Sequence, residues 1–174
     1  MNLSSCNLCP RIHSYLKTIK IKFPNYHCKP VPGSGSDKSN ICVIGLAPGL
    51  HGANKTGVPF TNDFSGNLIR SILLDVNLGD VFITNVVRCY PQNNKPLNIE
   101  KNNCQQYNLE ELTRLVNLKV IVTLGEIAYR QILKLYNIPL KSNKFKHDNV
   151  IELNSKIHLI SSYHCSKLNV NTKK

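Results

Sequence analysis

Cysteine is the residue type with the most evident chemical potential in this sequence, and four of its seven cysteines form two pairs. Cys6 and Cys9 stand as Cys-x-x-Cys near the start, whereas Cys89 and Cys104 follow much later. Four thiolates can hold tetrahedral zinc or a [4Fe-4S] cluster, and spacing alone does not distinguish the two. The odd number of cysteines favours ligation in a reducing compartment over a framework of disulfides. The alternative is that Cys89 and Cys104 are small buried hydrophobic residues.

A second set of reactive side chains lies in a glycine-rich stretch, residues 45–52 (GLAPGLHG) followed by 56–66 (TGVPFTNDFSG). Glycines let backbone amides approach a ligand, and a helix starting near residue 66 adds its N-terminal dipole. The stretch lacks the lysine and the spacing of a P-loop. His51, Phe60 and Asp63 could polarise a carbonyl, stack on a base and position water. The alternative for Asp63 is an N-cap of the following helix.

Charge points to a polyanionic partner. The 174 residues include 22 Lys and Arg against 10 Asp and Glu, which gives a net charge of +12 and a sequence pI near 9.5. Such an excess is typical of nucleic-acid-binding domains, although lysines scattered beside many asparagines could also reflect a general compositional bias. No apolar run approaches the length that a bilayer needs, and no signal peptide is evident. We therefore expect a protein of the cytoplasm, associated with the nucleoid, or of another reducing compartment that contains DNA.

These residues are positioned by an alternation of short β-branched runs and longer amphipathic runs, which is typical of an α/β sandwich. Strands are predicted over 41–44, 81–84, 119–124, 150–153 and 157–160, and helices over 10–21, 66–76, 100–116 and 126–136. The last two strands read as a hairpin, and residues 24–37 read as a loop packed against the domain. Because parallel strands joined by helices bind ligands beyond their carboxyl ends, the glycine-rich stretch lies where a site is expected. The length indicates a single domain, 1–174, with residues 1–40 as an N-terminal segment.

At this level of detail the sequence resembles a known family. Residues 45–66 (GLAPGLHGANKTGVPFTNDFSG) resemble the first signature of the family 5 (type b) uracil-DNA glycosylases, and residues 29–35 (KPVPGSG) resemble its lead-in. Further matches follow in order at 83–96 (ITNVVRCYPQNNKP), 122–128 (VTLGEIA) and 162–172 (SYHCSKLNVNT). The resemblance covers nearly the whole chain from Cys6 onward, and its motifs are long and specific.

The resemblance implies a three-layer α/β/α sandwich with a short central parallel sheet, and hydrolysis of the N-glycosidic bond of uracil in DNA. Other deaminated bases are further candidate substrates, and base flipping precedes a reaction that leaves an abasic site. It also implies a structural [4Fe-4S] cluster on Cys6, Cys9, Cys89 and Cys104, with zinc as the alternative. The expected partner is uracil-containing DNA, with no membrane partner, and the expected state is a monomer. No lysine replaces a catalytic group in the signatures, so a Schiff-base lyase is not implied.

Roles for individual residues follow from the same resemblance. Phe60 would stack on the flipped base, Asn85 would recognise its Watson–Crick edge, and Gly45 and Ala47 would complete the base-binding set. His164 would donate to the anion that develops on the base, while Asp63 and His51 complete the catalytic set. The expected DNA-binding residues are Ser166, Lys167, Leu168 and Asn169, with Lys167 on a phosphate and Leu168 as the wedge that fills the gap left by the base.

The chain differs from its relatives at three points, and two of them, Cys165 and a short C-terminal part, favour a rival interpretation: a catalytically weakened iron-sulfur or zinc protein that still binds DNA. Leu46-Ala47 replaces Gln-Asp or Glu-Ala of other families, so Asp63 would have to supply the carboxylate that orients water. Cys165 stands where the family has proline, and we therefore expect looser positioning of His164 and Ser166. Relatives also continue well past this motif, so a short C-terminal part is expected. A third interpretation is a small-nucleotide hydrolase, but the sequence lacks the second carboxylate cluster that would bind Mg²⁺ in such an enzyme.

Overall fold

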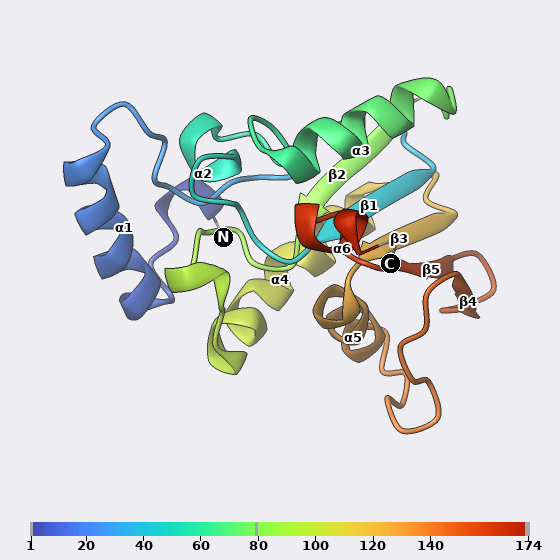
Figure 1. Ribbon diagram of the computed structural model, residues 1–174. Coiled ribbons are helices and arrows are strands. Elements are labelled where there is room, and N and C mark those ends of the chain that lie inside the picture. Colours follow the sequence, from blue (N-terminus) through green and yellow to red (C-terminus); the bar gives the residue numbers. More distant parts are fainter. Residues whose placement is uncertain (1, 79, 173–174) are drawn as a thin grey trace.

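The computed structural model describes residues 2–78 and 80–172, which build a five-stranded sheet with helices on both faces (Figure 1). The strands are β1 (Ile41–Gly45), β2 (Val81–Asn85), β3 (Val120–Leu124), β4 (Asn149–Glu152) and β5 (His158–Ser162). The helices are η1 (Leu3–Ser5), α1 (Pro10–Lys22), α2 (Ala53–Thr56), α3 (Phe64–Asp75), η2 (Gln92–Asn94), α4 (Asn98–Arg114), α5 (Glu126–Leu135) and α6 (Lys167–Asn171). All of the predicted strands and long helices are present, with boundaries that differ by up to two residues.

The sheet has the order β2-β1-β3-β5-β4, and its first four members run parallel. β4 pairs with β5 in the antiparallel direction, as the predicted hairpin requires, so the sheet is mixed rather than wholly parallel. The direction follows from the short connection, in which the Leu153 N–H donates to the Ile157 carbonyl at 2.9 Å. A parallel pair would need a crossover of a dozen or more residues.

Two separate apolar cores establish the three layers that the sequence predicts. Alternate residues of a strand point to opposite faces of the sheet, and in β1 Cys42 and Ile44 belong to one core while Val43 belongs to the other. The larger core takes its helical residues from α1, α4 and α5, and the smaller core takes Ile69 from α3. The sheet therefore lies between a layer of three helices and a layer formed by α3.

The segment between α1 and β1 packs against the domain, as predicted for residues 24–37. Val31 is buried and its N–H donates to the Arg88 carbonyl at 2.7 Å, while Ser34 forms a β-bridge with Ile83.

The N-terminal end of α1 is fixed to α4 by a bidentate ion pair. Arg11 Nε and Nη2 donate to the two carboxylate oxygens of the buried Glu100 at 2.8 and 2.7 Å. Bidentate arginine pairs of this kind are geometrically specific, so the start of α1 has a defined place beside α4.

The structure adds four short helices that hydrophobic periodicity did not predict: η1, α2, η2 and α6. Each spans three to five residues, which is too short for an apolar stripe to repeat. Among the described residues, no helix has both the length and the apolar character needed to cross a membrane.

Candidate active site and cysteine cavity

A cavity of about 80 Å³, here called the polar cavity, opens where β1 and β2 end. Its lining residues are Ala47, Pro48, Gly49, Ala53, Phe60, Asp63, Ser65, Asn85, Asn94 and His164. They come from the segment after β1, the end of β2, the loop that follows it and the loop after β5. Five residues assigned a role from the sequence therefore surround one cavity: Ala47, Phe60, Asp63, Asn85 and His164. Pro48, Gly49, Ala53, Ser65 and Asn94 were not predicted, although each belongs to a quoted motif.

Phe60 and Asn85 face each other across Gly45. Gly45 and Asn85 are register partners at the ends of β1 and β2. A Cβ at position 45 would lie 2.5 Å from Phe60 Cζ and 2.7 Å from Asn85 Oδ1, so only glycine leaves room for both side chains. Asn85 is 4% exposed, and within the described residues its side-chain amide has no hydrogen-bond partner. A buried amide that is free to pair is suited to recognising a base.

The backbone at Phe60 is strained, with φ at 51°, a region that non-glycine residues seldom adopt. Arg70 on α3 holds it by two hydrogen bonds, from Nε to the Phe60 carbonyl at 2.7 Å and from Nη2 to the Pro59 carbonyl at 3.0 Å. Gly66 permits this close approach, because a Cβ there would lie 2.5 Å from the carbonyl carbon of Phe60. The ring is thereby fixed against the smaller core, where it is 8% exposed.

Asp63 fulfils the capping role and retains a second carboxylate oxygen. Oδ1 accepts the Gly66 N–H at 2.8 Å, so Asp63 is the N-cap of α3, as the alternative from sequence proposed. Oδ2 faces the glycine-rich loop, and a Cβ at Gly49 would lie 2.7 Å from it. The two oxygens therefore have different surroundings, because Oδ1 is bound to the helix and Oδ2 faces the loop that lines the cavity.

His164 follows β5 and lies at the side of the cavity nearest α5. Burial lowers the pKa of His164 below its ordinary value, and the negative charge of Asp63 opposes this effect without cancelling it. Its carbonyl accepts from Asn169 Nδ2 at 2.8 Å. A Cβ at Gly125, which has φ at 96°, would lie 3.4 Å from the His164 Cβ. The imidazole is neutral at neutral pH and can act as an N–H donor.

Cys165 does not leave the loop as free as the missing proline suggests. Ser65 Oγ donates to the Cys165 carbonyl at 3.1 Å, and the Cys165 thiol lies 3.7 Å from the Ser65 carbonyl, which accepts its weak hydrogen bond. The Cys165 side chain also packs on the smaller core beneath Phe60. Two reciprocal contacts thus join the His164 loop to the start of α3, in place of the backbone constraint of a proline.

His51, the third member of the expected catalytic set, does not line the polar cavity. Its side chain is exposed, and Nδ1 is hydrogen-bonded to the Tyr26 hydroxyl at 2.7 Å. The ring also packs edge-on against Phe23. Its carbonyl accepts from Asn62 Nδ2 at 2.7 Å, which fixes the backbone of the glycine-rich loop. Sequence alone could not place this ring, because its partners lie about 25 residues earlier in the chain.

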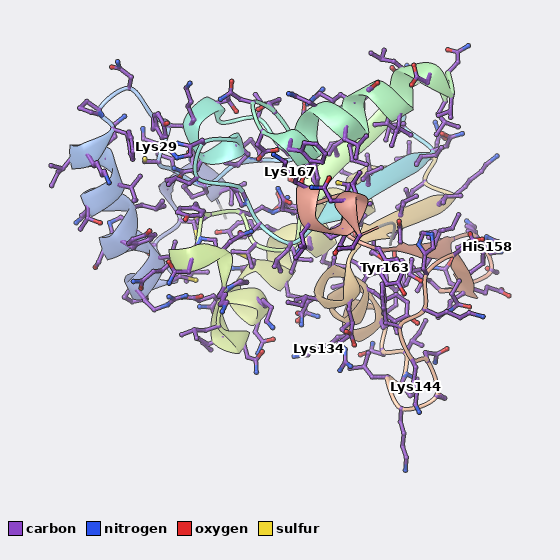
Figure 2. All side chains as sticks on the ribbon, viewed as in Figure 1. Lys29, Lys134, Lys144, His158, Tyr163 and Lys167 are labelled. Carbon is purple, nitrogen blue, oxygen red and sulfur yellow. The ribbon has the colours of Figure 1, made fainter. Side chains whose placement is uncertain are left out.

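The residues expected to contact DNA form a short helix beside His164. Ser166 is the N-cap of α6, and its Oγ accepts the Asn169 N–H at 3.3 Å. Leu168 is 72% exposed, and Lys167 is exposed on the same helix (Figure 2). An apolar side chain with so little burial has no role in the core, so the core alternative for Leu168 does not apply.

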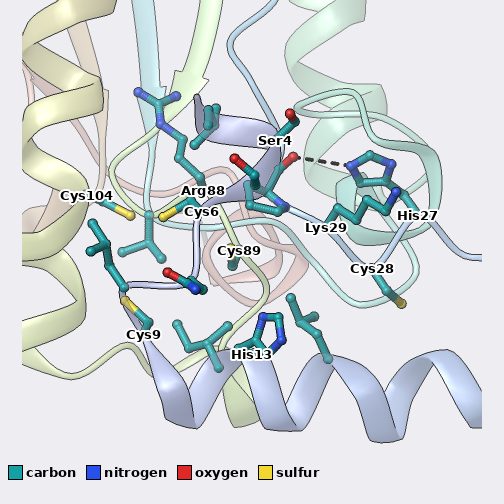
Figure 3. A pocket seen from close by; sticks show the side chains of 18 of the residues that line it. Ser4, Cys6, Cys9, His13, His27, Cys28, Lys29, Arg88, Cys89 and Cys104 are labelled. Carbon is teal, nitrogen blue, oxygen red and sulfur yellow. Dashed lines mark hydrogen bonds between the residues drawn. The ribbon is translucent and has the colours of Figure 1, made fainter. Parts of the chain in front are cut away.

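Four cysteines meet in a second cavity, of about 280 Å³, here called the cysteine cavity. Cys6, Cys9, Cys89 and Cys104 all line it, between the N-terminal segment, α1 and α4 (Figure 3). Burial raises the pKa of Cys104 to about 11 and also raises the pKa values of Cys9 and Cys89, and the charges of the neighbouring cysteines add to each effect. The four cysteines therefore share one cavity, in which burial disfavours the charged form of Cys9, Cys89 and Cys104.

The chemistry of this donor set fits a metal ion or a cluster with thiolate ligands. Burial disfavours a free thiolate, and bound metal is what normally stabilises several of them in one place. Asn103 Nδ2 approaches the Cys9 sulfur at 3.6 Å as a hydrogen-bond donor. Within residues 2–78 and 80–172, no three His, Cys, Asp or Glu side chains are already arranged around a metal position. Cys28 also lines the cavity, on the far side from Cys9 and Cys104 (Figure 3).

Comparison with known proteins assigns the chain to a family. Residues 32–174 match the uracil DNA glycosylase superfamily. A type-5 uracil-DNA glycosylase of Thermus thermophilus is 34% identical over 189 residues, covering 98% of this chain and 86% of the relative. One of Pyrobaculum aerophilum is 36% identical, covering 98% and 82%. A type-4 uracil-DNA glycosylase of Archaeoglobus fulgidus is 34% identical over 77% of this chain and 69% of the relative. The chain belongs to the uracil-DNA glycosylase superfamily and, within it, to the type-5 family.

Proposed function

We propose that this protein removes uracil from DNA by hydrolysing the N-glycosidic bond of a flipped nucleotide, leaving an abasic site. The observation that carries the proposal is the polar cavity, where an aromatic ring, a free amide, a neutral imidazole and a carboxylate converge. The bond breaks through an oxocarbenium-like sugar and an anionic base, so a catalyst must stabilise both charges and deliver water. Each of these tasks has a candidate side chain in the cavity.

Recognition of the base falls to Phe60 and Asn85. The Phe60 ring, fixed by its strained backbone and by Arg70, offers a flat surface for stacking. The Asn85 amide can donate to O4 of uracil and accept from N3–H, whereas cytosine presents the opposite pattern. Because Asn85 is buried, a base that does not match would leave its amide unpaired, which is the physical origin of discrimination.

Bond cleavage falls to His164 and Asp63. The neutral His164 imidazole donates a hydrogen bond to the anion that develops on the departing base, as an oxyanion donor does. Asp63 Oδ2 accepts a proton from the attacking water, while Oδ1 remains bound to the Gly66 N–H and keeps the carboxylate oriented. The α6 helix supplies Lys167 for a phosphate and Leu168 as the wedge that replaces the flipped nucleotide.

A duplex that contains one uracil tests the proposal directly. We expect the purified protein to convert it to an abasic site that alkali cleaves, and to leave a matched duplex with cytosine or thymine intact. Parallel duplexes with hypoxanthine and xanthine define the range of deaminated bases. Binding to the uracil duplex without cleavage would instead favour the rival interpretation, a DNA-binding protein of the same fold with weakened catalysis.

We further propose that the cysteine cavity holds a [4Fe-4S] cluster, with Cys6, Cys9, Cys89 and Cys104 as ligands. The cluster would join the N-terminal segment to α4 and to the loop after β2, which is a structural role. Protein purified without oxygen should be brown and contain about four irons per chain. Stoichiometric zinc without iron would overturn the cluster and leave the four ligands in place.

The partners and the compartment follow from the same two cavities. We also propose that the protein acts as a monomer, with residues 1–174 as a single domain. Its substrate would be uracil-containing DNA in the cytoplasm or another reducing compartment, where free thiols persist. Sedimentation at working concentration tests the monomer.

A further inference from the structure

A cluster of aromatic rings, of which Phe23 and Tyr26 are half-buried and His51 is exposed, lies outside the polar cavity, at the C-terminal end of α1. Phe23 and Tyr26 stack with their ring centroids 4.6 Å apart and an interplanar angle of 15°. His51 packs edge-on against both rings, at 5.6 and 5.9 Å, and its Nδ1 is hydrogen-bonded to the Tyr26 hydroxyl. The three rings form one rigid surface, although they come from two separate segments of the chain.

Three lysines surround these rings, and none of them forms an ion pair with another described residue. Lys22 Nζ lies 5.6 Å from the centre of the Phe23 ring, and Lys55 Nζ lies 5.8 Å from that of Tyr26. Lys20 Nζ donates to the Tyr26 carbonyl. In the part of the chain that the structure describes, every ion pair is formed by an arginine, so these three positive charges are uncompensated.

The cluster is joined to the segment that forms the polar cavity. The His27 N–H donates to the Lys55 carbonyl at 3.0 Å, which places Tyr26 beside Lys55. Asn62, which directly precedes Asp63 in the chain, donates from Nδ2 to the His51 carbonyl. In the view of Figure 1, α2 lies between α1 and α6. The rings and lysines therefore flank the site on the side away from the wedge helix.

We propose that Phe23, Tyr26, His51, Lys20, Lys22 and Lys55 form a second DNA contact, which binds the phosphodiester backbone on the side of the polar cavity away from α6. Rings that hold lysine ammonium groups, together with an imidazole whose Nε2 is free among the described residues, present positive charge and hydrogen-bond donors to phosphate. Two contacts on either side of the cavity would hold a duplex while the base between them is flipped. The proposal rests on the proposed function, because it gives His51 a role in substrate binding in place of catalysis.

The salt dependence of DNA affinity tests this surface. Each phosphate that a lysine neutralises adds about one to the slope of log affinity against log salt. The double variant Lys22→Ala, Lys55→Ala should therefore reduce the slope by roughly two and weaken binding. The matched control is Lys119→Ala, Lys156→Ala, which removes the same charge from the opposite end of the strands, where both residues line a separate hollow. That control should keep the wild-type slope.

The outcomes separate this proposal from the proposed function. A slope that falls equally in both double variants would overturn the surface, because only net charge would then matter, and an unchanged slope in the test variant would overturn it as well. Single-turnover excision at saturating enzyme should fall much less than affinity in the test variant. If the wild type excises no uracil, but the slope still falls in the test variant and not in the control variant, the function is refuted and the surface is supported.

Discussion

The two cavities of this protein are built in opposite ways. The polar cavity takes its residues from loops at one edge of the sheet, and most of them fall within a single stretch, residues 47–65. The cysteine cavity takes its four thiols from the N-terminal segment, the loop after β2 and α4, which only the folded chain brings together. Most of the polar cavity is thus local in sequence, although Asn85 and His164 come from distant segments, whereas the proposed metal ligation has no such continuous stretch.

Because the two cavities are built differently, we expect substitutions in them to have different effects on stability. The cysteine cavity lies against the larger core and beside a buried network, in which Arg88 Nη2 lies 2.9 Å from Glu111 and 2.7 Å from Asn108 Oδ1. Damage there should therefore affect stability. The polar cavity lies where β1 and β2 end, and although Phe60 and Asn85 are buried there, substitution of its polar side chains should cost less stability than loss of a cysteine ligand.

The largest effect is expected at the cysteine cavity. Cys104→Ser removes a proposed ligand that is 6% exposed, and we expect loss of most of the iron. The variant should also be destabilised by about 3 kcal/mol or more, which corresponds to roughly 6–12 °C in melting temperature for a chain of this size. Cys28→Ser is the control, because Cys28 lines the same cavity outside the proposed ligand set. Equal iron in both variants would contradict the ligand assignment.

At the polar cavity, His164→Ala should slow single-turnover excision by roughly 100- to 1,000-fold, as for a lost oxyanion donor.

The wild type should also become less stable as the pH falls through the ordinary histidine pKa of 6.5. The folded state keeps His164 neutral, so the unfolded chain binds more protons there and acidification favours unfolding. Thermal melts from pH 8 to pH 5 should show a weaker pH dependence in His164→Ala than in the wild type. An equal dependence would place the relevant titration elsewhere.

Asp63 can be divided into its two roles by paired substitutions. Asp63→Asn keeps a side chain that caps helices well, but it removes the negative charge. It should slow excision by something like 100-fold or more with a melting temperature near that of the wild type. Asp63→Ala should lose the same activity and, in addition, about 1 kcal/mol of stability from the missing cap. Full excision by Asp63→Asn would show that capping alone explains this residue.

Substrate preference should change when the recognition amide changes. Asn85→Asp replaces the donor by a carboxylate oxygen, and relative excision of uracil, hypoxanthine and cytosine should shift by roughly 10- to 100-fold. Asn94→Asp is the matched control, because Asn94 lines the same cavity at an exposed position. A uniform loss on all three bases in Asn85→Asp would assign Asn85 a structural role.

Sequence reasoning succeeded where residue spacing carries the information. The alternation of short β-branched runs with longer amphipathic runs predicted the five strands and the long helices, and Cys6 and Cys9 of the Cys-x-x-Cys pair line one cavity. It could not place the His51 ring, since the direction of that ring depends on Tyr26 in a distant segment. It also missed α6, because a five-residue helix has no room for a repeated apolar stripe. Long-range side-chain contacts and very short helices are set by tertiary packing, which periodicity does not record.

The smallest effect is expected where Cys165 and Ser65 hold the His164 loop, and it tests whether the polar cavity depends on local rigidity. Cys165→Ala removes the thiol contact to the Ser65 carbonyl and part of the packing beneath Phe60. In this variant His164 is still present but is less well aligned with the base. We therefore expect single-turnover excision to fall by less than about tenfold, with unchanged affinity for duplex DNA.

Cys165→Pro is the informative partner of this variant. Within the described residues the Cys165 N–H makes no backbone hydrogen bond, so proline removes no donor that the fold uses, and it fixes φ directly. Excision by Cys165→Pro should therefore return close to the wild-type rate, although the thiol is absent in both variants. If Cys165→Pro is instead as slow as Cys165→Ala, the thiol contributes through packing on the smaller core, and positioning of His164 must come from Ser65 and Asn169.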